Sequence, residues 1–455
     1  MAELSAKNNT ELILNGSLTK AIFSLAIPIV INNFIQTMYN LTDAYWLGKL
    51  GTSDMAGISL VSPVQNMVVN FGQGITLAGS ILISQYVGAK DLKNARSMAS
   101  QIFVCAMIFS IVLALVCCGC TPGIVQWLGA EGDVFIKGKT YLQIVILDLP
   151  FLFMINIFTA VSQAQGNTIR PMLLNLLGIL LNMIFDPLFM IGLDWGIAGA
   201  AFATLLAKVP CALIGFCLLC NKNNDVHLVF KNFRLERTKL ENIIKIGLPT
   251  AIGGSTMQFG FLLMTKNVLV FGDDAMAAYG IGNRINGIIT MPSNAMGSAV
   301  ATIVGQNIGA NQMGRAEKAY KKARWMIVCF LFVGGMILSR NVVSTALVGI
   351  FSKDARVISM AADFLSIMAF CCWTNGIHNT TTGLFQGTGN TIYTMAVEVS
   401  RLWIFRFATL FVLREWFNMQ ERSVWFSVVV SNAISAFILW VLYKCNLWKR
   451  NKASL

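Results

Sequence analysis

Charge is scarce in this sequence. Only 12% of the 455 residues are charged and 56% are hydrophobic, whereas a soluble globular protein carries roughly 25% charged residues. Histidine occurs only twice, which leaves little material for a metal site. The patterns HExxH, GxSxG and GxxxxGK[ST] are absent. These absences argue against an enzyme and exclude nucleotide hydrolysis through a P-loop as an energy source.

Long apolar runs stand in place of the missing charge. Runs of about 20 residues recur along the whole chain, long enough to cross a bilayer core of roughly 30 Å. The first run is too long for a signal peptide, so we expect it to be retained. The net charge of +13 is typical of basic cytoplasmic loops, and we expect no nucleic-acid partner. The sequence therefore indicates an all-α polytopic membrane protein with the lipid bilayer as its surroundings.

About twelve spanning helices are predicted, in two sets of six. The most polar interruption, residues 221–239, separates an N-terminal lobe (1–220) from a C-terminal lobe (240–455). Because lysine and arginine gather at alternate connections, we expect both termini and the 221–239 linker on the cytoplasmic side. The predicted spans lie near residues 18–47, 54–86, 95–119, 135–163, 169–192, 196–220, 240–271, 275–306, 316–339, 355–385, 390–414 and 423–446.

The two halves share repeated words. The dipeptide IP of the first span recurs as LP in the seventh, DMAG recurs as AMAA, and SQYVGAKD recurs as GQNIGANQ, all at an offset of 221 residues. GNTI, which begins at Gly166, recurs at Gly389. Since each half holds six spans, both halves insert with the same orientation, and the substrate path is expected at their interface. The repeat predicts pseudo-symmetric lobes and a transporter architecture.

A polar stripe runs along the first predicted helix. Asn33, Gln36, Asn40 and Asp43 follow one another at steps of three, four and three residues, so they share one face. Lipid does not tolerate such a stripe, because each unpaired polar group costs several kcal/mol. The stripe is either a hydrogen-bonding seam between helices or the wall of a cavity. The carboxylate of Asp43 favours a functional role.

A second acid lies in the fifth predicted helix. Asn182 and Asp186 are four residues apart on one face, and Pro187 loosens the following turn. Two carboxylates that meet in a low-dielectric site cannot easily both stay ionised. Such a site can hold a proton, or a small hard cation such as Na⁺ with further oxygen ligands. The alternative interpretation is that Asp186 merely marks the end of the helix.

Other charges within apolar runs carry weaker signals. Lys266 and Arg284 lie in the second-half equivalents of the first two helices, so we expect them to line the substrate cavity. Glu398 and Arg401 lie three residues apart, and mutual neutralisation is the simplest interpretation of that pair. The 22 methionines and 30 phenylalanines suit an adaptable hydrophobic pocket, although packing against lipid explains them equally well.

These words together resemble the MATE (multidrug and toxic compound extrusion) family, in its bacterial DinF/MepA-like branch. The resemblance spans nearly the whole chain and rests on AIPIVINNFIQTMYNLTDAYWLG, ISQYVGAKD, AQGNTIRP, NMIFDPLF and GIAGAAFAT, with the echoes GLP, VGQNIGA and FQGTGNT. It implies a twelve-helix antiporter whose two six-helix lobes form a V. It also implies export of cationic amphipathic compounds in exchange for H⁺ or Na⁺, from a monomer without cofactor in the bacterial inner membrane.

The resemblance assigns roles to individual residues. The acid of the family's first helix falls on Asp43, its fifth-helix Asn and Asp fall on Asn182 and Asp186, and its sixth-helix Thr falls on Thr204. All four belong to the N-terminal lobe. The resemblance therefore predicts that these residues hold the coupling H⁺ or Na⁺, and no other metal is expected.

The sequence departs from the NorM-type branch of that family. That branch carries an acid in the seventh helix where this chain has Met257 or Gln258, and another in the tenth helix, where this chain has Asn375, Gly376 and His378. Coupling is therefore expected to depend on the N-terminal lobe, and Met257 and Gln258 are expected to line the substrate cavity.

Two other functions remain open. A flippase for a lipid-linked oligosaccharide belongs to the same wider superfamily, but such proteins usually have a more cationic central cavity than this acidic, amide-rich first helix predicts. An intramembrane enzyme or receptor is the alternative outside transport. The internal repeat and the missing nucleophile or metal constellation argue against it.

Overall fold

The computed structural model describes residues 9–48, 52–231 and 233–449, and these ranges contain helices but no β-strand. The chain divides into two compact units. Unit 1 comprises Met1–Asn15 and Ile27–Ala251, and unit 2 comprises Gly16–Ala26 and Ile252–Leu455. The lobe limits predicted from the linker at 221–239 stay a prediction.

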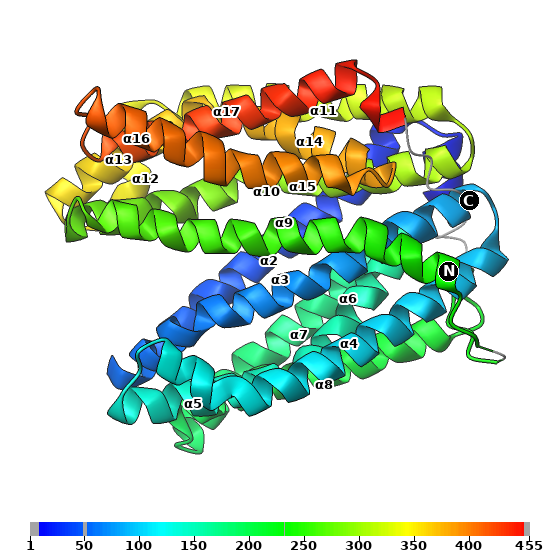
Figure 1. Ribbon diagram of the computed structural model, residues 1–455, viewed down its shortest axis with the longest axis horizontal. Coiled ribbons are helices and arrows are strands. Elements are labelled where there is room, and N and C mark those ends of the chain that lie inside the picture. The colour runs from blue at the N-terminus through cyan, green and yellow to red at the C-terminus, as the bar shows by residue number, and fades with distance from the viewer. Residues whose placement is uncertain (1–8, 49–51, 232, 450–455) are drawn as a thin grey trace. The chain divides into compact units, whose positions relative to one another are not determined.

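Unit 1 is a helical bundle from the first half of the chain. Helix α3 packs against α4, α5 and α6, and helix α8 packs against α5, α6 and α7 (Figure 1). The helices of unit 1 are α2 (Leu18–Leu47, from Ile27 onward), α3 (Thr52–Gly88), α4 (Leu92–Trp127), α5 (Gly132–Ile146), α6 (Leu149–Ala164), α7 (Ile169–Pro187), the π-helical turn η1 (Leu188–Gly192), α8 (Gly196–Cys220) and α9 (Arg237–Leu269, up to Ala251).

Unit 2 is built around α10, which packs against α11, α13 and α14, while α17 packs against α13, α14 and α16. The fully buried Trp425 anchors its core, with ring centroids 4.7 Å from Phe364 and 6.0 Å from Tyr279. After the rest of α9, the helices of unit 2 are α10 (Asp273–Gly309), α11 (Met313–Leu338), α12 (Asn341–Gly349), α13 (Ala355–Phe370), α14 (Trp373–Gly387), α15 (Thr391–Ser400), the π-helical turn η2 (Arg401–Arg406), α16 (Phe407–Glu415), α17 (Arg422–Lys444) and the 3₁₀ turn η3 (Leu447–Lys449).

The prediction of an all-α polytopic membrane protein is confirmed. Within the described residues, seven helices are long and apolar enough to cross a bilayer, or ten if each of three bent pairs counts as one span. The bends are 42° between α5 and α6, 81° between α11 and α12, and 53° between α13 and α14. The continuous helices predicted over 135–163 and 355–385 are therefore wrong. The first breaks beside Pro150, which cannot continue the hydrogen-bond ladder of a preceding helix.

The predicted spans at 240–271 and 390–414 are helical but are not among those ten. The second is divided into α15, η2 and α16, and it carries Glu398, Arg401 and Arg406. Charged side chains lower the hydropathy of a segment, so this helix needs protein partners in place of lipid around its charges.

The repeated words of the sequence are repeated helix ends in the structure. Lys90 after α3 and Asn311 after α10 adopt φ values of +60° and +57°. In both turns the next residue donates its backbone N–H to the carbonyl five residues earlier, at 3.0 Å and 2.7 Å. Gly166 and Gly389 of the GNTI words have φ values of +79° and +81°, with the same hydrogen bond at 2.9 Å and 2.8 Å. These are Schellman turns, so the words repeat because the same chain reversal repeats.

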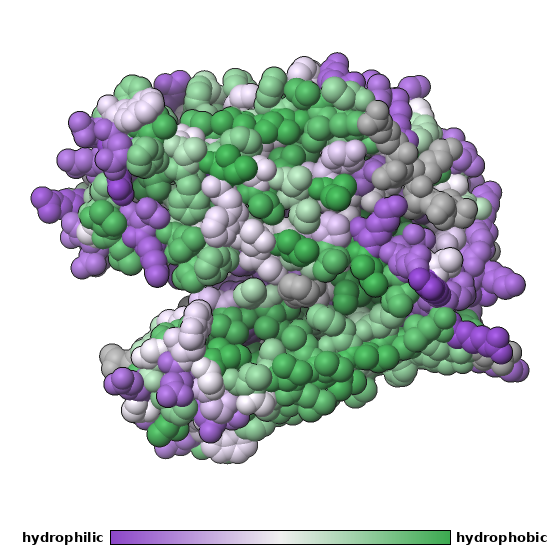
Figure 2. Space-filling model, viewed as in Figure 1, coloured by the Kyte–Doolittle hydropathy of each residue, from purple (hydrophilic) through white to green (hydrophobic). Residues whose placement is uncertain are grey.

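The helices expose apolar side chains along their lengths. Figure 2 shows hydrophobic residues along the helices and hydrophilic residues gathered at helix ends. A surface of this kind is stable in lipid, where contact with acyl chains replaces burial in a protein core. Helix α4 illustrates it with a row of exposed aliphatic residues, Ile108, Ile111, Val112, Leu115 and Val116.

Candidate functional site

Asn182 on α7 is the centre of a buried polar network in unit 1. Its side chain is 3% exposed, and Asp186, one turn later on α7, is fully buried. When the amide oxygen accepts from the backbone N–H of Thr204 at 3.1 Å, Nδ2 donates to Asp186 Oδ2 and to Tyr39 Oη, both at 2.9 Å. The opposite amide orientation makes one bond, to Thr204 Oγ1 at 3.4 Å. Because buried polar groups are almost always satisfied, the first orientation is favoured.

Helix α2 brings Asp43 to the same network. The carboxylates of Asp43 and Asp186 interact electrostatically, although the two residues are 143 positions apart in the chain. None of the ion pairs found among the described residues involves either carboxylate. Two acids without a basic partner in a membrane-spanning bundle form a site that a cation stabilises. The four residues predicted for ion coupling are thus brought together.

Two tyrosines complete the network, and the sequence analysis missed both. Tyr39 on α2 is hydrogen-bonded to Thr204 and interacts with both carboxylates. Tyr141 on α5 also interacts electrostatically with Asp43 and Asp186. Tyr39 lies one turn before Asp43, so the polar stripe contained the signal for it. Tyr141 had no such signal, since its helix is distant in sequence.

The end of α7 is a sequence-encoded irregularity beside the acid. Pro187 directly follows Asp186 and lacks the N–H that a continuing α-helix needs. The chain passes there into the π-helical turn η1. Single π-helical turns within helices occur frequently at functional sites. Asp186 therefore ends the regular part of its helix and is a network residue at the same time, so both interpretations of this acid hold.

A cavity of about 190 Å³ adjoins the network. Its polar wall includes Gln36, Tyr39, Asn182 and Thr204, all four of which lie on or beside the network. Lys208 also lines the cavity, but it forms an ion pair with the buried Asp148. The remaining lining residues are two asparagines and a set of small or aliphatic residues, namely Asn156, Asn175, Leu152, Ile155, Leu174, Gly178, Ile179, Ala207 and Cys211.

The predicted stripe on α2 is only partly part of this cavity. Gln36 lines it and donates through Nε2 to Asn40 Oδ1 at 3.3 Å. The carbonyl of Asn33 accepts a hydrogen bond from the Thr37 hydroxyl at 3.0 Å. Neither Asn33 nor Asn40 is among the lining residues. Their assignment to the substrate cavity stays a prediction.

The candidates of the second half all lie in unit 2. The Met257 sulfur accepts a hydrogen bond from Arg401 Nη2 at 3.0 Å. Gln258, Lys266 and Arg284 are exposed. Their side chains line neither the cavity beside the acids nor the one described next, so their role in substrate binding stays a prediction.

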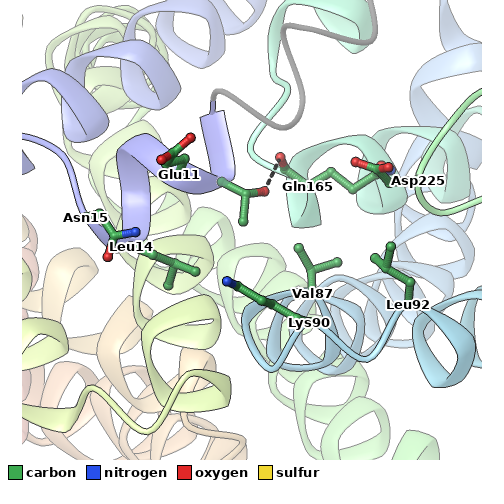
Figure 3. Close-up of a pocket in the computed structure, with 9 residues that line it drawn as sticks. Glu11, Leu14, Asn15, Val87, Lys90, Leu92, Gln165 and Asp225 are labelled. Carbon is green, nitrogen blue, oxygen red and sulfur yellow. Dashed lines mark hydrogen bonds between the residues drawn. The ribbon is translucent and has the colours of Figure 1, made fainter.

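A second cavity in unit 1, of about 420 Å³, is separate from the acid network. Figure 3 shows Glu11, Lys90, Gln165 and Asp225 around it, with a hydrogen bond from the Thr10 hydroxyl to the Gln165 carbonyl. It shares no lining residue with the first cavity and contains none of the predicted site residues. The acid network therefore remains the candidate site.

The chemistry available to the network is reversible cation binding. Its donors are two carboxylates, an amide and the hydroxyls of Tyr39, Tyr141 and Thr204, a hard-oxygen set that suits H⁺ or Na⁺. In the described part of the chain, no group of three or more His, Cys, Asp or Glu side chains lies close enough to bind a metal ion.

Comparisons with known proteins agree with this architecture. The sequence profile of the MatE family matches residues 28–188 and 249–412, more than half of the chain. The two matched segments begin 221 residues apart, which is the offset of the repeated words. The profile therefore recognises each half separately.

Similar proteins are known from bacteria. The multidrug export protein MepA of Staphylococcus aureus is 28% identical over 372 residues, which cover 81% of this chain and 82% of MepA. The probable multidrug resistance protein YoeA of Bacillus subtilis is 21% identical over 434 residues, covering 94% and 93%. A solved structure described as the outward-facing conformation of a multidrug resistance MATE family transporter has the same fold, with a TM-score of 0.91, 22% identity and coverage of 96% and 98%. With the two family matches and the apolar helices, this shows that the chain belongs to the MatE family of membrane transporters.

Proposed function

We propose that this protein is a cation-coupled antiporter that exports cationic amphipathic compounds by alternating access. The observation that carries the proposal is the network of Asp43, Asn182 and Asp186, in which two membrane-embedded acids meet without a basic partner. The names of the relatives MepA and YoeA, which refer to multidrug export and resistance, support export of this kind.

The exchange follows from the charge of the network. With both carboxylates ionised, the cavity beside Asn182 attracts a cationic substrate, and its aliphatic wall accepts an apolar body. Binding of H⁺ or Na⁺ removes that attraction, so ion and substrate occupy the site alternately. The network then shifts the transporter between two states only through its different charge in each.

The amide of Asn182 bears on the identity of the ion. It presents its NH₂ group to Asp186 and its oxygen to the Thr204 N–H. A Na⁺ ligand role for Asn182 requires the opposite orientation and the loss of those bonds, whereas a proton can bind either carboxylate without that change. We therefore infer H⁺ as the coupling ion that fits this arrangement better.

Gradient-driven efflux tests the proposal. A cationic dye is loaded into proteoliposomes, and a proton or a sodium gradient is applied separately to wild type, Asp43→Asn and Asp186→Asn. The gradient-dependent rate should fall at least about 10-fold in both variants, because the neutral amide cannot exchange a cation. Asp194→Asn is the matched control: Asp194 is exposed in the turn after η1 with a φ of +56°, which asparagine tolerates.

Two outcomes would contradict the proposal. Equal gradient dependence in wild type and both acid variants would make the network a packing feature. Absence of dye movement under either gradient, with folded protein, would favour the lipid-linked cargo of a flippase.

We also infer that the protein is a monomer in the bacterial cytoplasmic membrane with both termini inside. The basic connections support this orientation. Labelling of single cysteines introduced near each terminus, on sealed cells, would reveal an external terminus if the inference is wrong.

A further inference from the structure

A second buried charge cluster lies in unit 2 and has no part in the proposed exchange. It comprises His378 on α14, Glu398 on α15, and Arg401 and Arg406 on η2. His378 is 1% exposed, Arg401 9% and Arg406 3%. His378 Nε2 lies 2.7 Å from Glu398 Oε1, and Arg401 Nη2 lies 2.7 Å from Glu398 Oε2. Mutual neutralisation of Glu398 and Arg401 is therefore only part of the arrangement.

The π-helical turn η2 collects the two arginines. Its hydrogen bonds run from residue i to i+5, so Arg401 and Arg406, five residues apart, lie one turn apart on a similar face. Arg406 donates from Nε to Ser431 Oγ at 3.1 Å and from Nη2 to Asn432 Oδ1 at 3.2 Å. Arg401 Nε and Arg406 Nη1 are buried and make no hydrogen bond among the described residues. The cluster thus holds more positive charge than it neutralises.

Hydrogen-bond accounting locates a proton in this cluster. The Ser435 hydroxyl donates its only hydrogen to the Asn432 carbonyl at 2.8 Å. Its oxygen therefore accepts from His378 Nδ1, 3.2 Å away, and Nδ1 carries a hydrogen. The contact of 2.7 Å between Nε2 and Oε1 then needs one more hydrogen, on either the imidazole or the carboxyl. Without it, two lone pairs would face each other.

Charge opposes what the hydrogen bonds require. With the extra proton, the imidazole and carboxyl together are neutral and the two arginines leave the cluster at +2. Without the proton the cluster carries +1. The other titratable group facing it is Tyr279 on α10, which interacts with Arg406. A proton that geometry holds and neighbouring charge repels is poised to leave when the geometry changes.

We propose that His378 and Glu398 form a second proton-binding site of this transporter. The pair takes up one proton between Nε2 and Oε1 when α14, α15 and α17 are in contact, and it releases that proton when the contact opens. The role of the pair in transport rests on the proposed export function. The proton site itself does not, and it is tested without any gradient.

The presence of only two histidines makes a direct test possible. The full chain is labelled with ¹⁵N-histidine in lipid nanodiscs, on a His227→Gln background in which His378 is the only histidine. His227 is distant in sequence, in the 221–231 connection, where its Nδ1 lies 3.0 Å from the Asn224 carbonyl. Between about pH 5 and pH 9, the range in which histidine sites change charge, the imidazole should pass from two N–H groups to one, and Nδ1 should keep its hydrogen. The same proton count across the whole range would overturn the proposal.

Two variants sharpen the result. Ser435→Ala removes the acceptor of the Nδ1 hydrogen, so the spectrum at high pH should change from one tautomer to a mixture. Glu398→Gln removes the proton-sharing partner, so the pH-dependent change should be displaced from that of the His227→Gln background. Superimposable titrations with and without the Glu398 carboxyl would contradict the site.

Efflux separates this inference from the proposed function. If Asp43→Asn abolishes gradient dependence and Glu398→Gln alters the pH profile of the rate, both stand. If His378 titrates as expected but no gradient drives efflux, the proton site stands and the antiport proposal fails. If Glu398→Gln leaves the pH profile of a working antiporter unchanged, the second site has no role in transport.

Discussion

The two units bury polar clusters of opposite character. In unit 1, the carboxylates of Asp43 and Asp186 are surrounded by an amide and hydroxyls. In unit 2, Glu398 is the one acid beside two arginines and a histidine. The first cluster is short of positive charge and the second has an excess of it. The difference shows that repeated halves can keep the same chain reversals while their buried chemistry diverges.

The largest expected difference between the clusters is in the effect of neutralising an acid. Glu398→Gln leaves the buried Arg401 and Arg406 without a carboxylate, and loss of one partner of a buried pair costs about 3–5 kcal/mol. Asp186→Asn removes one of two like charges, so we expect little loss or a gain of stability. Thermal unfolding in detergent measures both.

A double variant serves as the control for this comparison. Glu398→Gln combined with Arg401→Gln removes both charges, and it should regain part of the stability lost in Glu398→Gln alone. Equal destabilisation by Asp186→Asn and Glu398→Gln would contradict the contrast between the clusters.

A smaller effect is expected at the amide that organises unit 1. Asn182→Ala removes the hydrogen bonds to Asp186, Tyr39 and Thr204, and loss of an orienting partner costs roughly 10-fold in ion affinity or activity. The matched control is Asn175→Ala, two turns earlier on α7, which loses one bond to Asn32 Oδ1 at 3.1 Å. The concentration of coupling ion at half-maximal efflux is the measurement. Similar shifts in both variants would show that Asn182 has no special place in the network.

The smallest expected effect is at equivalent helix starts outside the membrane core. Asp91 caps α4 by accepting from the Asn94 backbone N–H at 3.1 Å, whereas Gln312, 221 residues later, makes no side-chain cap for α11. Asp91→Ala should cost about 1 kcal/mol, and Gln312→Asp should stabilise by a similar or smaller amount. Chemical unfolding of each variant against wild type measures the difference.

The contribution of Asp91 should depend on pH. Hydrogen bonds from the side chain and then the backbone of Asn94 lower the pKa of Asp91 below its ordinary 3.8. A carboxyl with a lowered pKa stabilises the fold above its unfolded pKa and loses that effect as the pH falls through the folded value. The gap between wild type and Asp91→Ala should therefore narrow only below about pH 4. Asp91→Asn keeps a capping oxygen that does not titrate, so a pH-independent gap between it and Asp91→Ala is the control.

Several features of this protein were readable from sequence because they depend on local rules. Apolar length predicts spanning helices, since a bilayer core has a fixed thickness. The repeated words predict duplication because a Schellman turn requires particular residues at its left-handed position. The spacing from Asn33 to Asp43 predicts a polar face, since helical periodicity is uniform. Helix breaks were read poorly, because Leu147 and Cys371 lie in apolar segments and the packing of the flanking helices determines where the bend falls.

By itself, therefore, the sequence determined an all-helical, duplicated membrane protein with acids at Asp43 and Asp186. Only the tertiary structure decided which side chains meet. Tyr141 approaches the acids from another helix, and His378 meets Glu398 across 20 positions of sequence. The physical reason is that periodicity gives the face of a helix on which a residue lies, whereas its partner depends on how several helices pack. The charge of a buried site is the sum over those partners, and no single segment contains it.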